Sequence, residues 1–273
     1  MLLHDFTILA DSLFPPQAAM TDDPIGLQIT SQRGTASNIH VAFEVTNDVV
    51  SEAISIGADL LVVFHPLIFQ PLKNLAGNLR VPYLVRRLIQ ADIALFVIHT
   101  NFDVHPQGTS HLFARNIGLA PNRFLTPSVI DGYGMGAVAT VSEPLPFTEL
   151  LQRIAQLSER PLAFCPPLNT TVDSVAVVGG SGVSFMDAAI AQKIDVLITA
   201  DVKYHDFHAA AGRIGLIDAG HYEMEQFVPE GIKDIISPHL PDVTVSVSTV
   251  VTNPVHYHSP LSIDISTPLT GLV

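Results

Sequence analysis

The sequence has little cysteine, little positive charge and no long apolar run. Cys165 is the single cysteine, so an internal disulfide and a cysteine-rich zinc motif are both excluded. Lys and Arg total 13 against 26 Asp and Glu, and a net charge of −13 argues against nucleic acid or an anionic membrane surface as a partner. Runs such as Leu60–Val63 and Ile93–Ile98 are far shorter than the roughly 20 residues of a membrane span. We therefore expect a cytoplasmic protein without secretion or membrane insertion.

The chain does contain enough apolar sequence for a folded enzyme-like body. Its 273 residues are 48% hydrophobic and only 14% charged, which is too apolar for a disordered chain. Short β-branched runs alternate with helical patterns, and this alternation predicts an α/β fold. The predicted strands are 39–45, 59–63, 93–100, 174–178, 195–199 and 242–251, and the predicted helices are 47–56, 81–91 and 185–193.

The strand-helix-strand order of residues 39–63 recurs at residues 174–199, which predicts two related halves. The glycines of 132–136 and the prolines of 142–147 favour a hinge between them. The late strand could return to the first half. The predicted domains are therefore 1–125 plus 237–273, and 126–236.

Four residues at predicted strand ends or at a helix start carry the most informative chemistry: His65, Asp103, His221 and Glu225. His221 and Glu225 are four residues apart, so they share one face of a helix. Imidazole plus carboxylate without thiolate suits Zn²⁺, Mn²⁺, Fe²⁺, Co²⁺ or Ni²⁺. Each residue also has a structural interpretation, because a His–Glu pair at this spacing is common on helix surfaces and an Asp after a strand often bonds backbone.

Several blocks of the chain resemble, in order, the signature blocks of the Nif-three family, also known as GTP cyclohydrolase I type 2-like proteins. The resemblance covers about residues 20–235. The blocks are Asp23–Gln28, Val62–Leu72, His99–Asp103, Gly179–Gly182, Ile198–Asp206 and Gly220–Glu225.

The resemblance implies two interlocked α/β/α halves with mixed sheets, a dinuclear metal site in the cleft between them and a ring-shaped homohexamer. The family's ligands fall on Phe64, His65, Asp103, His221 and Glu225. Phenylalanine cannot coordinate a metal, so four of the five expected protein ligands remain. The chain could therefore bind either one or two divalent ions (Zn, Fe, Mn, Co or Ni).

Other polar residues near these blocks have two interpretations each. His99, His105 and His205 could replace the imidazole missing at position 64, or could be a strand residue, a loop cap and a group that orients a carboxylate. Asp201, Lys203 and Asp206 could contact substrate or pair with one another. Gly179–Gly182 opens a helix, where a tight turn is favoured over an anion site because the third glycine of a dinucleotide motif is Phe185.

Two functions from different classes follow. The first is a metal-dependent hydrolase in which a metal-activated water attacks a small-molecule substrate, with a nucleotide suggested by the family label and no catalytic residue assigned beyond the ligands. The second is an oligomeric protein that binds metal or a protein partner without catalysis, its old site degraded by Phe64.

Overall fold

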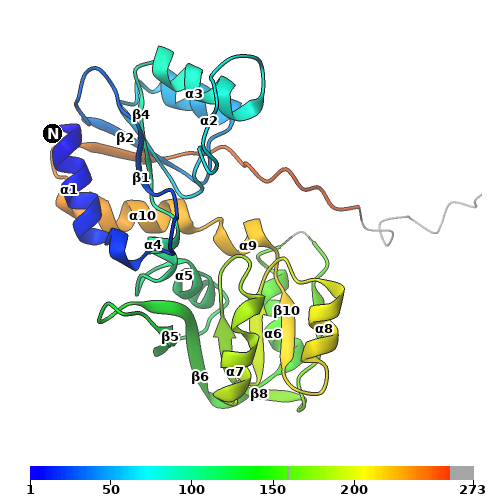
Figure 1. Ribbon diagram of the computed structural model, residues 1–273. Coiled ribbons are helices and arrows are strands. Elements are labelled where there is room, and N and C mark those ends of the chain that lie inside the picture. Colours follow the sequence, from blue (N-terminus) through cyan, green and yellow to red (C-terminus); the bar gives the residue numbers. More distant parts are fainter. Residues whose placement is uncertain (159, 259–273) are drawn as a thin grey trace, which may run out of the picture.

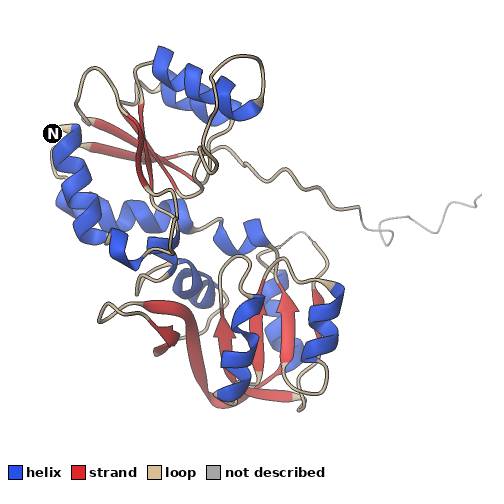
Figure 2. Ribbon diagram, viewed as in Figure 1, coloured by secondary structure: helices blue, strands red, loops and turns tan. Residues whose placement is uncertain are grey.

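Two β-sheets, each covered by helices on both faces, organise the computed structural model (Figures 1 and 2). The structure describes residues 1–158 and 160–258, so the end of the predicted first domain, residues 259–273, lies outside the described residues. Both sheets contain parallel and antiparallel strand pairs, which confirms the prediction of an α/β fold with mixed sheets. Among the helices of the described residues, none has the length and apolar character to cross a membrane.

The first sheet has the strand order β1-β4-β3-β2-β11. Its strands are β1 (Gly26–Ile29), β2 (Asn38–Ala42), β3 (Leu60–Val63), β4 (Ala94–Val97) and β11 (Thr244–Val247). Only β1 is antiparallel to its neighbour. β3 and β4 are buried along their whole length, because helices cover both faces of central parallel strands, and this explains their continuous apolar sequence.

Successive residues of these strands point to opposite faces, and different helices cover each face. One face packs against α1 (Leu3–Leu13) and α10 (Val228–Ile236). The other packs against α2 (Asn47–Ser55) and α3 (Arg80–Gln90). The residue before α2 is Thr46, whose hydroxyl accepts the N–H of Val49 and caps the helix.

The second sheet has the strand order β5-β6-β8-β9-β10-β7, with β8, β9 and β10 parallel. Its strands are β5 (Arg123–Pro127), β6 (Gly134–Pro146), β7 (Ala163–Cys165), β8 (Thr171–Val177), β9 (Val196–Thr199) and β10 (Gly215–Asp218). One face carries α5 (Thr109–Asn116), α6 (Phe147–Ala155) and α9 (His221–Glu225). The other carries α7 (Met186–Ala191) and α8 (Tyr204–Ala210).

The remaining short helices are α4 (Thr100–Asp103) and the 3-10 turns Pro16–Ala18, Val183–Phe185 and Ser237–His239. In both sheets a parallel strand pair is joined through a helix, β2-α2-β3 in the first and β8-α7-β9 in the second. This arrangement matches the expected relation between the halves.

The chain links the two sheets at several points. β11 pairs with β2, so the late strand returns to the first sheet. α10 packs in the core of the first sheet although it falls inside the predicted range 126–236, and α5 packs against the second sheet although it falls inside 1–125. Figure 1 shows α4, α5 and α9 in the region between the two sheets.

The hinge predicted from the glycines and prolines of 132–147 is wrong. Most of this segment forms β6, the longest strand among the described residues. Its pairing with β8 is regular up to Thr140 and resumes at Leu145. Pro144 lies in the irregular stretch between them, where the backbone N–H that proline lacks is not required for a ladder hydrogen bond.

Candidate metal centre

The carboxyl ends of strands from both sheets meet at one cavity of about 370 Å³. This is the edge at which open α/β sheets bind ligands. His65 follows β3, His99 follows β4, and the turn after β8 and the start of α9 face them. The lining residues are Met20, His65, Phe69, His99, Thr100, Asp103, Met135, Val178, Gly179, Gly180, Ser181, Gly182, Phe185, His221 and Glu225.

Three of the four predicted ligands converge in this cavity. His65 and His221 both direct Nε2 toward Oε2 of Glu225, at 3.3 and 3.0 Å, and their ring centroids are 5.5 Å apart. One ligand atom from each of the three residues lies within 4.8 Å of the other two. The distant segments that carry them are therefore brought together by the fold.

Local structure explains these positions. His65 is fixed just past β3 because its backbone N–H donates to the carbonyl of Phe43 at 2.9 Å. His221 and Glu225 begin and end the short helix α9, so the four-residue spacing places both on one face.

Glu225 is 3% exposed, and its buried Oε2 has no hydrogen-bond partner of acceptable geometry in the described part of the chain. Burial raises the pKa of Glu225, but the facing imidazoles His221 and His65 lower it more, so the carboxyl is held ionised. Two imidazole nitrogens face this buried carboxylate oxygen without forming a hydrogen bond of acceptable geometry. Such a set of nitrogen and oxygen donors fits a divalent cation.

His221 is held in orientation by a carboxylate behind it. Its Nδ1 lies 2.7 Å from Oδ2 of Asp201, which also accepts the hydroxyl of Ser181. Interaction with Glu225 raises the pKa of His221 to about 10 against the effect of burial, and Asp201 adds to the rise. A carboxylate on the second ring nitrogen is typical of metal-binding histidines.

Asp206, in the same segment as Asp201, has a structural role. Oδ2 of Asp206 accepts the backbone N–H of Lys203 at 2.8 Å and caps α8. This contact uses the backbone of Lys203 and not its ammonium group, so it gives a structural role to Asp206 alone.

Asp103, the fourth predicted ligand, lines the same cavity but does not belong to the converging group of three. Its Oδ1 accepts the hydroxyl of Thr109 at 2.6 Å. Burial, followed by the charge of Glu225, raises the pKa of Asp103 to about 7. Its role as a ligand stays a prediction.

His99 is the one proposed replacement imidazole that lines the cavity, and an aspartate that sequence reasoning did not assign to the site holds it. Nδ1 of His99 lies 2.8 Å from Oδ1 of Asp23, whose other oxygen accepts the backbone N–H and the hydroxyl of Thr100. Burial lowers the pKa of His99, but Asp23 and the charge of Asp103 raise it more. The only sequence signal for Asp23 is its place in the first family block.

The other two candidate imidazoles lie away from the cavity lining. His105 packs against Phe14 and Phe102, and burial lowers its pKa to about 4. His205 lies on α8 beside Tyr204.

The glycine turn after β8, Gly179–Gly182, lines the cavity. Gly180 has φ +61°, and a Cβ there would lie 2.7 Å from Oε1 of Glu225. The N–H of Gly179 donates to Ser110 and that of Gly182 to Thr199, at 3.1 and 2.8 Å. The N–H of Gly182 also donates to the carbonyl of Gly180 at 3.0 Å, and together with the positive φ of Gly180 this supports a tight turn.

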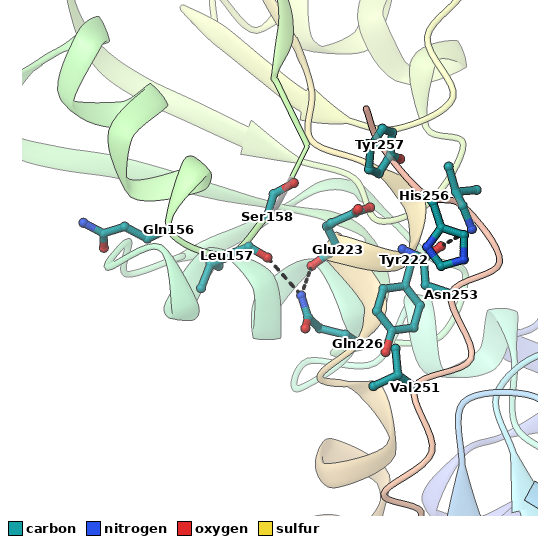
Figure 3. Close-up of a pocket in the computed structure, with 11 residues that line it drawn as sticks. Gln156, Leu157, Ser158, Tyr222, Glu223, Gln226, Val251, Asn253, His256 and Tyr257 are labelled. Carbon is teal, nitrogen blue, oxygen red and sulfur yellow. Dashed lines mark hydrogen bonds between the residues drawn. The ribbon is translucent and has the colours of Figure 1, made fainter. Parts of the chain in front are cut away.

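Helix α9 faces a second cavity on its other side, of about 550 Å³ (Figure 3). Tyr222, Glu223 and Gln226 line it together with residues of 156–158 and 251–257. Gln226 is fixed there by hydrogen bonds from its Nε2 to the carbonyls of Leu157 and Glu223. Glu223 lines this second cavity and not the first.

These features define a class of protein: a two-sheet α/β fold with a candidate metal site where the strand ends of both sheets meet. The family model described as Duf34/NIF3 (NGG1p interacting factor 3) matches residues 1–254. The chain belongs to this family, which confirms the resemblance.

Relatives cover almost the whole chain. The GTP cyclohydrolase 1 type 2 homolog of Streptomyces coelicolor is 32% identical over 92% of this chain and 93% of its own length. The protein of the same name from Streptococcus pneumoniae is 31% identical over 94% of this chain and 100% of its own.

Solved structures show the same fold. A hypothetical protein of Staphylococcus aureus matches with a TM-score of 0.85 and 27% identity over 94% of this chain and 99% of its own. A Bacillus cereus protein related to NIF3 matches with a TM-score of 0.86 and 21% identity over the same shares.

Proposed function

We propose that this protein is a metal-dependent hydrolase that acts on a small molecule. The observation that supports it is the convergence of His65, His221 and Glu225 in a cavity open to a ligand. A divalent cation bound there would polarise a substrate oxygen and lower the pKa of a water. Membership of the family and the names of the relatives agree with this chemistry.

The chain's own residues would divide the work. Glu225 supplies a buried negative charge, and Asp201 fixes the ring of His221 so that its Nε2 faces the cavity. Asp103 and His99 line the same cavity and would offer further polar groups to a substrate. Gly180 has no side chain, so the space beside Glu225 stays free for a ligand.

A nucleotide is the substrate class to test first, since the relatives are named GTP cyclohydrolase 1 type 2 homologs. In this proposal water is delivered to an electrophilic carbon of the base. No residue of this chain is assigned to base recognition.

The test compares two glutamates of the same helix. In Glu225→Gln the charge facing both imidazoles is lost, whereas Glu223→Gln changes a carboxylate that lines the other cavity. We expect metal content and GTP consumption to fall at least tenfold in the first variant and to stay near wild type in the second. Retention of metal by Glu225→Gln, or equal loss in both, would refute the proposed site.

Phe64 favours a second function, a non-catalytic oligomer that binds metal or a protein partner. This alternative predicts no turnover of any nucleotide, whether or not metal is bound. A screen of nucleoside triphosphates with the metal-loaded protein separates the two functions, because turnover that disappears in Glu225→Gln requires the enzyme.

A cytoplasmic homohexamer stays part of the proposal. Light scattering should give about six times the 29.4 kDa of one chain. A mass near that of one chain would remove the hexamer and leave the metal site untouched.

A further inference from the structure

Phe64 occupies the position where the family resemblance places a ligand. It is 1% exposed and belongs to the hydrophobic core of the first sheet. Its ring centroid lies 6.0 Å from that of Phe43 and 6.3 Å from that of Phe102. It does not line the cavity. The residue before His65 is therefore a packing residue without a donor atom, although its ring lies beside the site, with its centroid 5.1 Å from that of His65.

His99 is the group best placed to compensate, because its ring centroid is 5.3 Å from that of Phe64 and 5.7 Å from that of His65. However, Nδ1 of His99 lies 2.8 Å from Oδ1 of Asp23. The His99 ring is not part of the converging group of His65, His221 and Glu225. Throughout residues 1–158 and 160–258, the one set of three His, Cys, Asp or Glu side chains that converges within 4.8 Å is His65, His221 and Glu225. A second set around His99 and Asp103 is not formed.

The donor chemistry of this set suits one ion. Two imidazoles and one carboxylate leave coordination positions free, as in catalytic zinc sites and in mononuclear Fe(II) sites. A second ion about 3.5–4 Å away would require ligands of its own. Two nearby cations would also need more negative charge, and Asp103 is the only further carboxylate among the residues that line the cavity.

We propose that each chain binds a single divalent ion, on His65, His221 and Glu225, and that Phe64 prevents a second. His99 is then a polar group of the cavity wall and not a metal ligand. This inference rests on the proposed metal site and specifies its stoichiometry.

The first experiment counts metal in the full-length protein. Metal-free protein is titrated with Zn²⁺ alone, excess is removed by dialysis, and zinc per chain is measured by mass spectrometry. We expect about one ion in the wild type, about one in His99→Ala and none in His221→Ala. Two ions in the wild type, or loss of the ion in His99→Ala, would overturn the single-ion site but leave a metal-dependent function. No ion in the wild type would overturn both proposals.

The second experiment adds the missing imidazole. In Phe64→His two adjacent histidines follow β3, and we expect the zinc content to rise from one to two per chain. A folded variant that still binds one ion would overturn the role assigned to Phe64. Because position 64 is in the core, circular dichroism must first show that the variant folds; if it does not, the wild type and His99→Ala counts decide the stoichiometry.

Discussion

Glu52 should stabilise the fold through its ionised form, and the change that tests this is Glu52→Gln. Its Oε1 accepts the backbone N–H and hydroxyl of Thr249 at 3.1 and 2.8 Å, while Oε2 accepts the hydroxyl of Ser248 and lies 3.1 Å from Nε2 of His40. Helix α2 is thereby joined to the segment after β11. Burial raises the pKa of Glu52, but these hydrogen bonds outweigh it and lower the pKa to about 2.

The magnitude follows from linkage between proton binding and folding. A pKa of about 2 in place of the ordinary 4.5 corresponds to an upper limit of about 3 kcal/mol. Solvent screening of this partly exposed carboxylate reduces the contribution to about 1–2 kcal/mol. Because the folded pKa lies below the unfolded one, the stabilisation is complete above about pH 4.5 and is lost as pH falls toward 2.

The assay is the free energy of unfolding from urea denaturation at pH 7, 5 and 3. Glu52→Gln should lower it by about 1–2 kcal/mol at pH 7, equivalent to about 2–8 °C in melting temperature, and the difference from wild type should shrink at pH 3. Glu230→Gln is the matched control, since Glu230 is 57% exposed and forms an ion pair with Lys233 on the helix surface. Equal losses in both variants, or a difference independent of pH, would refute the reasoning.

Three further predictions concern the metal centre. Interaction with Glu225 raises the pKa of His221 to about 10, so zinc binding at pH 7 should release about one proton, and the affinity for zinc should increase as pH rises. Calorimetry in two buffers of different ionisation enthalpy measures the number of protons released. Zinc binding without proton release would contradict the prediction. Asp201→Asn should lower the pKa of His221 in an NMR titration of metal-free protein, because the carboxylate is 2.7 Å from Nδ1; an unchanged pKa would remove the role given to Asp201. Gly180→Ala places a Cβ 2.7 Å from Oε1 of Glu225 at φ +61°, so zinc affinity should fall at least tenfold while the fold persists; wild-type affinity would show that the turn can move away.

The regular elements were largely predictable because their sequence pattern is local. β3 and β4 appear as apolar runs, and α2 and α3 follow helical periodicity, with no end displaced by more than three residues. β6 was not predictable. Its glycines and prolines are typical of a turn. They are accommodated in a strand because its pairing with β8 is irregular, and this long-range pairing has no signal in the local sequence.

The site was predictable in part. His221 and Glu225 are close in sequence, and the structure pairs them. His65 was expected near them because it follows a predicted strand and belongs to one of the family blocks. Asp23 was missed as the partner of His99, because 76 residues separate them and only the folded sheet brings them together. That His105 packs in the core could not be judged either, since its aromatic neighbours come from other parts of the chain.

The place of α10 and β11 in the first sheet has a consequence for synthesis on the ribosome. β2 spans Asn38–Ala42 and pairs with β3 on one edge, but the strand on its other edge spans Thr244–Val247, and the helix that covers one face begins at Val228. While residues 1–125 emerge, the edge of β2 and the apolar surface beneath α10 have no partner. Such surfaces in a nascent chain invite aggregation. Completion of the first sheet therefore waits until Val247 has been synthesised, and products truncated before α10 should depend on chaperones.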